Sequence, residues 1–175
     1  MDNGPPGIPP SQATAAFRMP RGWTGIANDR QNHGSERFWM CPAPLVNVSG
    51  HPSMEVVFAY LDFTAPYTQE GQAGGYLDAI HHHEDDDVKM ERVGDVENMQ
   101  FGRISTFHFY SAYIGERWNA NLIAAPLGLS VELHCKMSTE LEECRPAFEA
   151  LLRSVRVNGA KPSHQDDPRR LERGW

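Results

Sequence analysis

Residues 129–157 read LSVELHCKMSTELEECRPAFEALLRSVRV, and this stretch joins two different hydrophobic periods. Over 129–137 apolar and polar residues alternate, which predicts a strand with one dry face and one polar face. Beyond it the apolar positions recur every three or four residues, the spacing of an amphipathic helix. These helical positions are Leu141, Cys144, Phe148, Leu151, Leu152 and Val155. The stretch therefore predicts a half-buried strand that leads directly into a helix.

Local signals set the limits of this C-terminal helix. Thr139 and Glu142 have the spacing of a capping box, in which each side chain bonds to backbone of the other residue. Pro146 interrupts the apolar stripe, so either a second helix begins there with proline in its first turn or one helix kinks. From Asn158 the sequence turns polar, and we expect 158–175 to form a tail.

Further strand signals lie in series before this pair. The segments 88–93, 97–113 and 117–125 are rich in apolar, β-branched and aromatic residues, and the links between the later ones are short. Links of this length suit antiparallel hairpins. A well-buried strand is also predicted over 54–63, which contains the same residue types. The sequence thus predicts an antiparallel meander that follows an earlier buried strand.

A helix is predicted between these two groups of strands. Thr68 is a suitable N-cap, and the apolar residues after it fall on one helical stripe. Three glycines weaken this helix by about 1 kcal/mol each, so packing of the stripe must hold it. The stripe consists of Ala73, Tyr76, Leu77 and Ile80. Strands, a helix, a meander and a final helix indicate an α+β fold, an antiparallel β-sheet flanked by helices.

The N-terminal part has weaker signals. We expect 1–14 to be a flexible lead, followed by a short strand through Phe17 and Met19. That strand should end at Pro20, because proline cannot donate to a sheet ladder. Asparagine, aspartate and glycine then predict a polar loop over 28–36.

The composition is that of one globular domain, which we place at 15–157. The chain has 175 residues, of which 40% are hydrophobic and 22% charged. Its net charge of −7 argues against a nucleic-acid partner, which normally binds a basic surface. Neither a transmembrane segment nor a signal peptide is predicted. Both a cytoplasmic location and an exported one, with the signal removed, are open.

The cysteines leave two interpretations. Cys41, Cys135 and Cys144 are an odd number, which does not make a complete disulfide framework. We interpret all three as small buried hydrophobic residues. A bridge between Cys135 and Cys144 is the alternative.

The stretch HHHEDDD at 81–87 is the main metal-ligand signal. Imidazole and carboxylate groups bind transition metals, so His81, His82, His83 and Asp85 are candidate ligands. Adjacent histidines on a helix point about 100° apart, however, and cannot all bind one ion. Histidine is favourable at a helix C-terminus and aspartate is not. We therefore interpret the stretch as a helix end and an acidic turn, and expect no cofactor beyond an adventitious divalent metal.

A second histidine pair lies in the predicted strands. On one face of the sheet, His108 and His134 would form a ligand set or a general base with Glu116 or Glu132 nearby. We favour the simpler interpretation that both are ordinary, half-exposed strand residues.

Four aromatic residues are candidates for a binding groove. Trp23, Phe38, Trp39 and Trp118 would suit a partner surface, because tryptophan is enriched at interfaces. The alternative is that they belong to the core. Two of them lie in 33–44, which we expect to be a long loop, and long loops in compact domains are often functional.

Three of these segments resemble a known superfamily. FRMPRGWTG (17–25) is similar to the opening strand and P-x-G-W turn of PsbP-like and DcrB-like domains. GYLDAI (75–80) stands where their first long helix stands, and 129–157 is similar to their closing strand and helix. The superfamily also includes the Ran-binding nucleotide-release proteins. The resemblance implies an α/β/α sandwich, and accessory, lipoprotein or partner-binding roles without a common catalytic signature.

From these signals we expect a non-enzymatic bacterial accessory domain that binds a protein or a small ligand. One alternative is a metal-binding protein or a metal-dependent hydrolase that uses 81–87. The other is an immunity-type or secretion-associated accessory protein.

Overall fold

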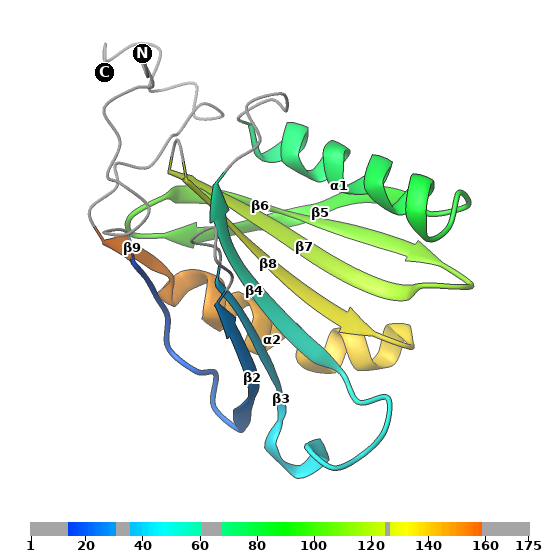
Figure 1. The fold of residues 1–175 in the computed structure, drawn as a ribbon, viewed down its shortest axis with the longest axis horizontal. Coiled ribbons are helices and arrows are strands. Elements are labelled where there is room, and N and C mark those ends of the chain that lie inside the picture. Colours follow the sequence, from blue (N-terminus) through cyan, green and yellow to red (C-terminus); the bar gives the residue numbers. More distant parts are fainter. Residues whose placement is uncertain (1–13, 31–35, 61–67, 125–126, 159–175) are drawn as a thin grey trace.

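A computed structural model describes residues 14–30, 36–60, 68–124 and 127–158. Within these ranges the chain forms one seven-stranded antiparallel sheet, a two-stranded ribbon and an α-helix on each face of the sheet (Figure 1). The α+β fold that the sequence predicts, an antiparallel sheet flanked by helices, is confirmed. In chain order the elements are β1 (Thr14–Ala16), β2 (Trp23–Arg30), β3 (Glu36–Pro42), a 3-10 turn (Ala43–Leu45), β4 (Ser53–Tyr60), α1 (Gln69–His83), β5 (Lys89–Asn98), β6 (Gly102–Ser111), β7 (Gly115–Ala124), β8 (Leu127–Cys135), α2 (Ser138–Ser154) and β9 (Arg156–Asn158).

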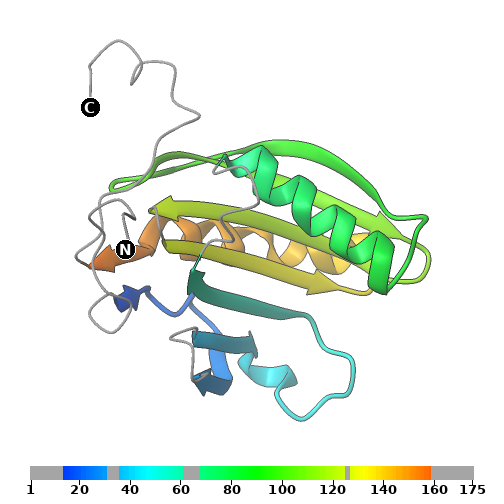
Figure 2. The same ribbon diagram turned by 45° about the horizontal axis from the view of Figure 1, so that its top comes forward.

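The sheet consists of two meanders that meet in its middle. The first is β2–β3–β4, the second is β5–β6–β7–β8, and the strand order across the sheet is β2-β3-β4-β8-β7-β6-β5. The antiparallel pair β4–β8 joins the two meanders. After β4 the chain passes through α1 and re-enters the sheet at the far edge as β5 (Figures 1 and 2). Strand β1 pairs with β9, which brings the two ends of the described chain together.

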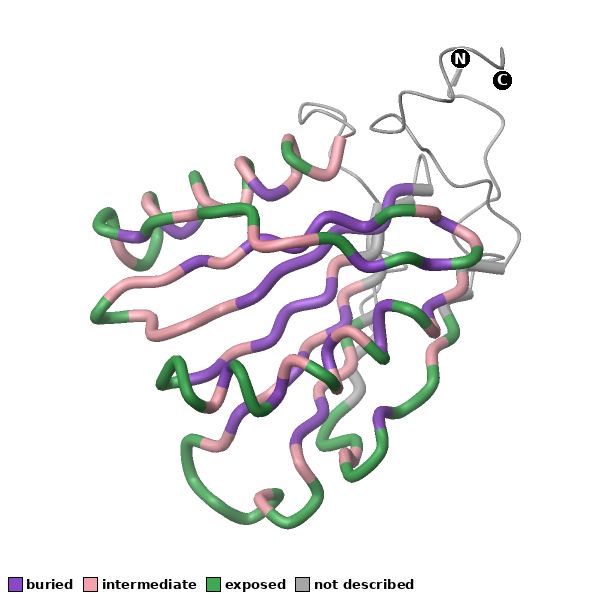
Figure 3. The backbone as a smooth tube through the Cα atoms, turned by 180° about the vertical axis from the view of Figure 1, so that it is seen from behind, coloured by how far each residue is buried: buried purple, intermediate pink, exposed green. Residues whose placement is uncertain are grey.

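The larger core lies between the sheet and α2. Strict alternation along β4 and β8 sends Met54, Val56, Val131 and Leu133 to this face, where all four are fully buried. The predicted stripe of α2 packs on them, and the ring of its Phe148 meets that of Trp118 edge to face at 5.9 Å. In Figure 3, seen from behind, the buried positions run along the central strands under α2.

The opposite face of the sheet is covered by α1 only in part. The helix lies over β6 and β7, where Ala73 and Ile80 pack against Phe107 and Phe109 in a second, smaller core. The ring of Tyr76 packs edge-on against Phe109 at 5.0 Å. The polar face of β8 and the neighbouring part of β4 lie beside this helix and not beneath it (Figure 2). We call this uncovered part of the α1 side the open face. Its residues are Glu55, Glu132, His134, Arg37 and Trp39.

Several predicted limits of the elements were wrong. Residues 17–20 are irregular, and the predicted strand is replaced by β1 before them and β2 after them. The polar loop predicted over 28–36 holds the end of β2 and the start of β3, with 31–35 outside the described residues. The long loop predicted over 33–44 is largely β3. The polar end of β2, residues 28–30, concealed its extended structure, and the apolar part of β3 is too short to distinguish a strand from a loop by its sequence.

The second meander and α2 also differ in detail from the prediction. The single strand predicted over 97–113 is the end of β5, a tight turn and β6, because Gly102 adopts a positive φ of 72° that allows the chain to reverse. The carboxylate that caps α2 is Glu140 and not the predicted Glu142. It accepts a hydrogen bond from the backbone N–H of Lys136 at 2.9 Å. Pro146 lies inside this helix, which continues past it. All three cysteines are free and buried, as the first interpretation predicted.

Asn98, at the end of β5, joins the sheet to the C-terminal end of α2. Its side chain is 4% exposed and donates to the carbonyls of Leu152 at 2.7 Å and Val155 at 3.0 Å. Its Oδ1 accepts from the backbone N–H groups of Gln100 at 2.8 Å and Phe101 at 3.0 Å. One amide thus satisfies helix carbonyls that lack an intrahelical partner and also fixes the β5–β6 turn.

We expect Asn98→Ala to lower the free energy of unfolding by about 2–4 kcal/mol, because it leaves several buried backbone groups without partners. Urea titration at neutral pH measures this change. The adjacent Met99→Ala is the matched control, since Met99 is 92% exposed and should change the free energy by less than about 0.5 kcal/mol. Equal effects of the two substitutions would contradict the role of Asn98.

Candidate functional site

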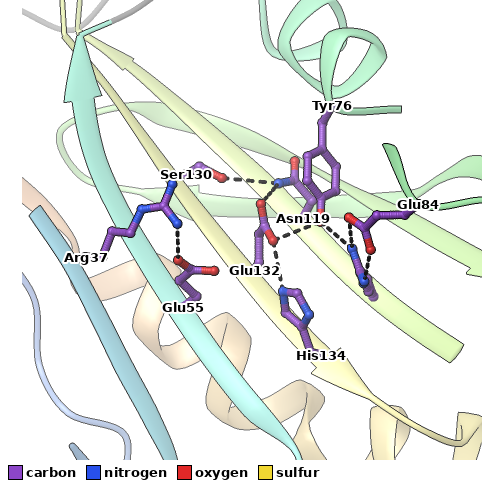
Figure 4. Close-up of polar contacts among 9 residues, drawn as sticks. Arg37, Glu55, Tyr76, Glu84, Asn119, Ser130, Glu132 and His134 are labelled. Atoms are coloured by element: carbon purple, nitrogen blue, oxygen red, sulfur yellow. Dashed lines mark hydrogen bonds and ion pairs between the residues drawn. The ribbon is translucent and has the colours of Figure 1, made fainter. Parts of the chain in front are cut away.

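Glu132 is the centre of the polar network on the open face. It is the buried acid among the described residues, at 9% exposed. Its Oε2 accepts from the hydroxyl of Tyr76 at 2.9 Å and lies 2.9 Å from Nε2 of His134 (Figure 4). Its Oε1 accepts from the amide of Asn119 at 3.5 Å. The donors come from α1, β7 and β8, so a carboxylate that is costly to desolvate is held from three sides.

Glu55 stands directly opposite Glu132 on the neighbouring strand. The two residues are register partners in the β4–β8 pair, and like charges in this position are destabilising. On its other side Glu55 is 3.4 Å from a guanidinium nitrogen of Arg37, whose side chain is 45% exposed. Burial raises the pKa of the Glu55 carboxyl, and the negative charge of Glu132 raises it further. The sheet therefore presents two carboxylates side by side and only partly neutralised.

A second set of contacts ties the end of α1 to the same face. Arg117 on β7 binds both carboxylate oxygens of Glu84, at 3.2 and 2.7 Å, and also donates to the hydroxyl of Tyr76 at 3.2 Å. The hydrogen bond from Arg117 lowers the pKa of Glu84, which caps α1. Burial and then the charge of Glu132 raise the pKa of Tyr76 well above its usual range, so its hydroxyl stays a donor. These contacts hold the end of α1 against β7, beside the open face.

The geometry brings together a set of metal-ligand atoms. One carboxylate oxygen each from Glu55 and Glu132 and one imidazole nitrogen from His134 lie within 4.8 Å of one another. Two carboxylates and one imidazole are a suitable donor set for a divalent transition ion. Arg37 and Trp39 on β3 are the other two residues of the open face, and Trp39 is the register partner of Glu55.

The four predicted metal ligands lie elsewhere, at the end of α1. His81 bonds through Nε2 to the carbonyl of Val88 at 2.8 Å, and the exposed rings of His82 and His83 pack edge to face at 4.6 Å. Asp85 accepts from the hydroxyl of Ser111. Among the described residues the group of ligand atoms found here is Asp85, Asp86 and Asp87, without a histidine. Helix α1 ends at His83, as interpreted, and metal binding by these histidines stays a prediction.

The four predicted groove residues do not form one surface. Trp118 is 3% exposed in the α2-side core, and Trp23 and Phe38 pack against that core while partly exposed. Trp39 alternates with Phe38 along β3 and faces the open face. The guanidinium of Arg145 covers the Trp118 ring at 4.9 Å from its centroid. Only Trp39 of the four therefore accompanies the polar network, and a binding role for the others stays a prediction.

His108 and His134 do not share a face of the sheet. His108 is the register partner of Trp118 and lies 3.2 Å from Glu91, with Glu116 bonded to its other ring nitrogen. Because Trp118 belongs to the α2-side core, His108 lies on that side and His134 on the other. The two histidines cannot contribute to one site.

Sequence reasoning missed Glu55 and Asn119. A signal for Glu55 was present, because it is a charged residue within the buried strand segment MEVVFAYLDF, where a charge calls for a partner. The pairing with Glu132 was hidden, since it depends on the register of β4 against β8, two strands that lie far apart in the sequence.

We expect Glu55→Gln to raise the free energy of unfolding of metal-free protein by about 0.5 kcal/mol at neutral pH, because it removes a like charge opposite Glu132. The folded pKa of Glu55 lies above its unfolded value, so ionisation destabilises the folded state as the pH rises through that window. The gain should therefore fade as the pH falls below the ordinary pKa of glutamate.

Urea unfolding with a chelator, repeated across a pH series, measures this difference. Glu143→Gln on the exposed side of α2 is the control, and we expect it to leave the pH profile of stability unchanged. A Glu55→Gln protein that is less stable than the original chain at neutral pH would contradict a net repulsion between Glu55 and Glu132.

Comparisons with known proteins give a likeness of fold. No family model matches the chain, and no curated protein matches it by sequence. Among solved structures, the chain is similar to the solution structure of cyanobacterial PsbP (CyanoP) from Synechocystis sp. PCC 6803, with a TM-score of 0.54 and 10% sequence identity. The match covers 90% of this chain and 98% of that one. None of the described helices combines the length and apolar character needed to span a membrane. The resemblance that the sequence suggested is thus confirmed at the level of structure: the chain has a PsbP-like fold.

Proposed function

We propose that the chain is an accessory binding domain whose open face holds a divalent cation between Glu55, Glu132 and His134. The observation that carries this proposal is the opposed pair of carboxylates with an imidazole beside it, all within 4.8 Å. A cation at that point would remove the repulsion between the carboxylates, which the protein's own groups relieve only in part. The hydrogen bonds from Tyr76 and Asn119 would keep Glu132 oriented toward the ion, as outer partners of metal ligands do.

The chemistry of the ligand set favours zinc or manganese. Imidazole nitrogen suits zinc, carboxylate oxygen suits manganese, and a set with both binds either ion. Three protein ligands leave at least one coordination position open. That position would accept an oxygen ligand from a small molecule or a carboxylate from a partner protein, with the ring of Trp39 available for contact beside it. The cation would thus serve as the attachment point of an accessory domain.

Calorimetric titration with zinc tests this function, followed by thermal unfolding with and without the ion. We expect one ion for each chain and an unfolding midpoint that rises with zinc concentration, since the ion binds the folded state. Glu132→Gln and His134→Ala should each weaken binding about tenfold or more.

The double variant His82→Ala/His83→Ala is the control, because it removes the two exposed histidines of the 81–83 run, which lie outside the open face. We expect it to bind the ion as the original chain does. Loss of binding in this variant, with unchanged binding in Glu132→Gln, would assign the ion to 81–87 and refute the proposed site. Absence of binding in the original chain would refute a cation-binding function at this face.

A further inference from the structure

A cavity of about 710 Å³ lies between the segment that joins β1 to β2 and the C-terminal end of α2. This volume is in the range of small-molecule sites. The joining segment is attached to the helix, because the backbone N–H of Arg18 donates to the hydroxyl of Ser154 at 2.9 Å. The same hydroxyl donates to the carbonyl of Leu151 at 2.8 Å. Figure 1 shows the segment descending in blue from the β1–β9 ribbon toward β2.

Positive charge is concentrated in this cavity. Arg18, Arg21, Arg153 and Arg156 line it, and none of its described lining residues is acidic. Arg153 is paired with Glu149 at 3.0 Å, and Arg156 donates to main-chain carbonyls at the end of α2. The guanidinium groups of Arg18 and Arg21 have no such partner within the described part of the chain. The chain as a whole has a net charge of −7, so an excess of basic residues in the composition does not explain this cluster of arginines.

Apolar side chains line the same cavity. Met99, in the β5–β6 turn, is 92% exposed, and Met19 is 43% exposed. The apolar part of the lining also includes Phe17, Pro20 and two alanines, Ala16 and Ala150. Methionine is flexible and polarisable, and exposed methionines suit a surface that adapts to an apolar ligand. The cavity therefore combines charges of one sign with an apolar strip.

We propose that this cavity binds an anionic amphiphile, a molecule in which a phosphate or carboxylate group is joined to an apolar chain. Arg18 and Arg21 would bind the anion through charge-assisted, two-pronged hydrogen bonds, the geometry that guanidinium groups favour with such anions. Met19 and Met99 would cover the apolar chain. The anion would also relieve the repulsion among the four arginines. The cavity is on the α2 side of the sheet, so this site is independent of the proposed cation site.

Titration of the full chain with decyl phosphate, at concentrations below micelle formation, tests the proposal. We expect saturable binding that is at least about tenfold tighter than binding of inorganic phosphate or of the uncharged decyl maltoside. Arg18→Gln/Arg21→Gln should weaken binding of decyl phosphate about tenfold or more. Met19→Ser/Met99→Ser should weaken binding of decyl phosphate and leave that of inorganic phosphate unchanged.

Matched substitutions outside the cavity control for general effects. Arg103→Gln and Met137→Ser remove an exposed arginine and an exposed methionine from other surfaces, and should leave affinity unchanged. Co-sedimentation with phosphatidylglycerol vesicles, compared with phosphatidylcholine vesicles, identifies the source. Selective capture that decyl phosphate reverses indicates a lipid headgroup, and binding of decyl phosphate alone indicates a free amphiphile.

Three results would overturn the proposal. The first is an affinity for decyl phosphate that the Arg18→Gln/Arg21→Gln substitutions do not change. The second is equal binding of decyl phosphate and decyl maltoside, which would reduce the cavity to an apolar patch. The third is tighter binding of an oligoglutamate peptide than of decyl phosphate, which would make it a site for an acidic protein segment.

Discussion

One α-helix on each face of a seven-stranded sheet is the constraint on which this structure depends. Strands lie about 4.8 Å apart, so seven of them extend roughly 29 Å across, whereas a helix with its side chains is about 10–12 Å wide. Each helix therefore covers only part of a face. On the α2 side, aromatic and aliphatic side chains of the strands complete the core. On the α1 side, the strands beyond the helix carry polar residues, and the polar groups of these side chains must form hydrogen bonds with one another.

The network around Glu132 meets that requirement and also holds α1 in place. The hydroxyl of Tyr76 and the carboxylate of Glu84 reach from the helix to β8 and β7, so the same contacts that satisfy buried polar groups fix the helix over the sheet. What the network leaves unbalanced is Glu55 opposite Glu132. Two acids in this position reduce the stability of the sheet, because like charges lie directly opposite each other. An imbalance of this kind in a fixed setting favours a binding site.

The fold was largely readable from the sequence because its signals are local. Alternation in β8, the stripe in α2 and the cap at Thr68 each follow from neighbouring residues, and the structure has all three. The candidate site could not be predicted from the sequence, because it depends on the pairing of β4 with β8. These two strands are separated in the sequence by every element from α1 to β7. The histidine run at 81–87 attracted attention through its composition, yet His134, an isolated histidine on a strand, is the one whose imidazole lies within 4.8 Å of the carboxylates of both Glu55 and Glu132.

The most direct test of the account is the position of a bound ion in a crystal of the full chain grown with manganese. Anomalous scattering from manganese locates the ion without any assumption about its ligands. We expect a peak between Glu55, Glu132 and His134, with the ion bonded to atoms of all three side chains. A peak at the histidines of 81–83 alone, or a well-ordered open face without any peak, would contradict it.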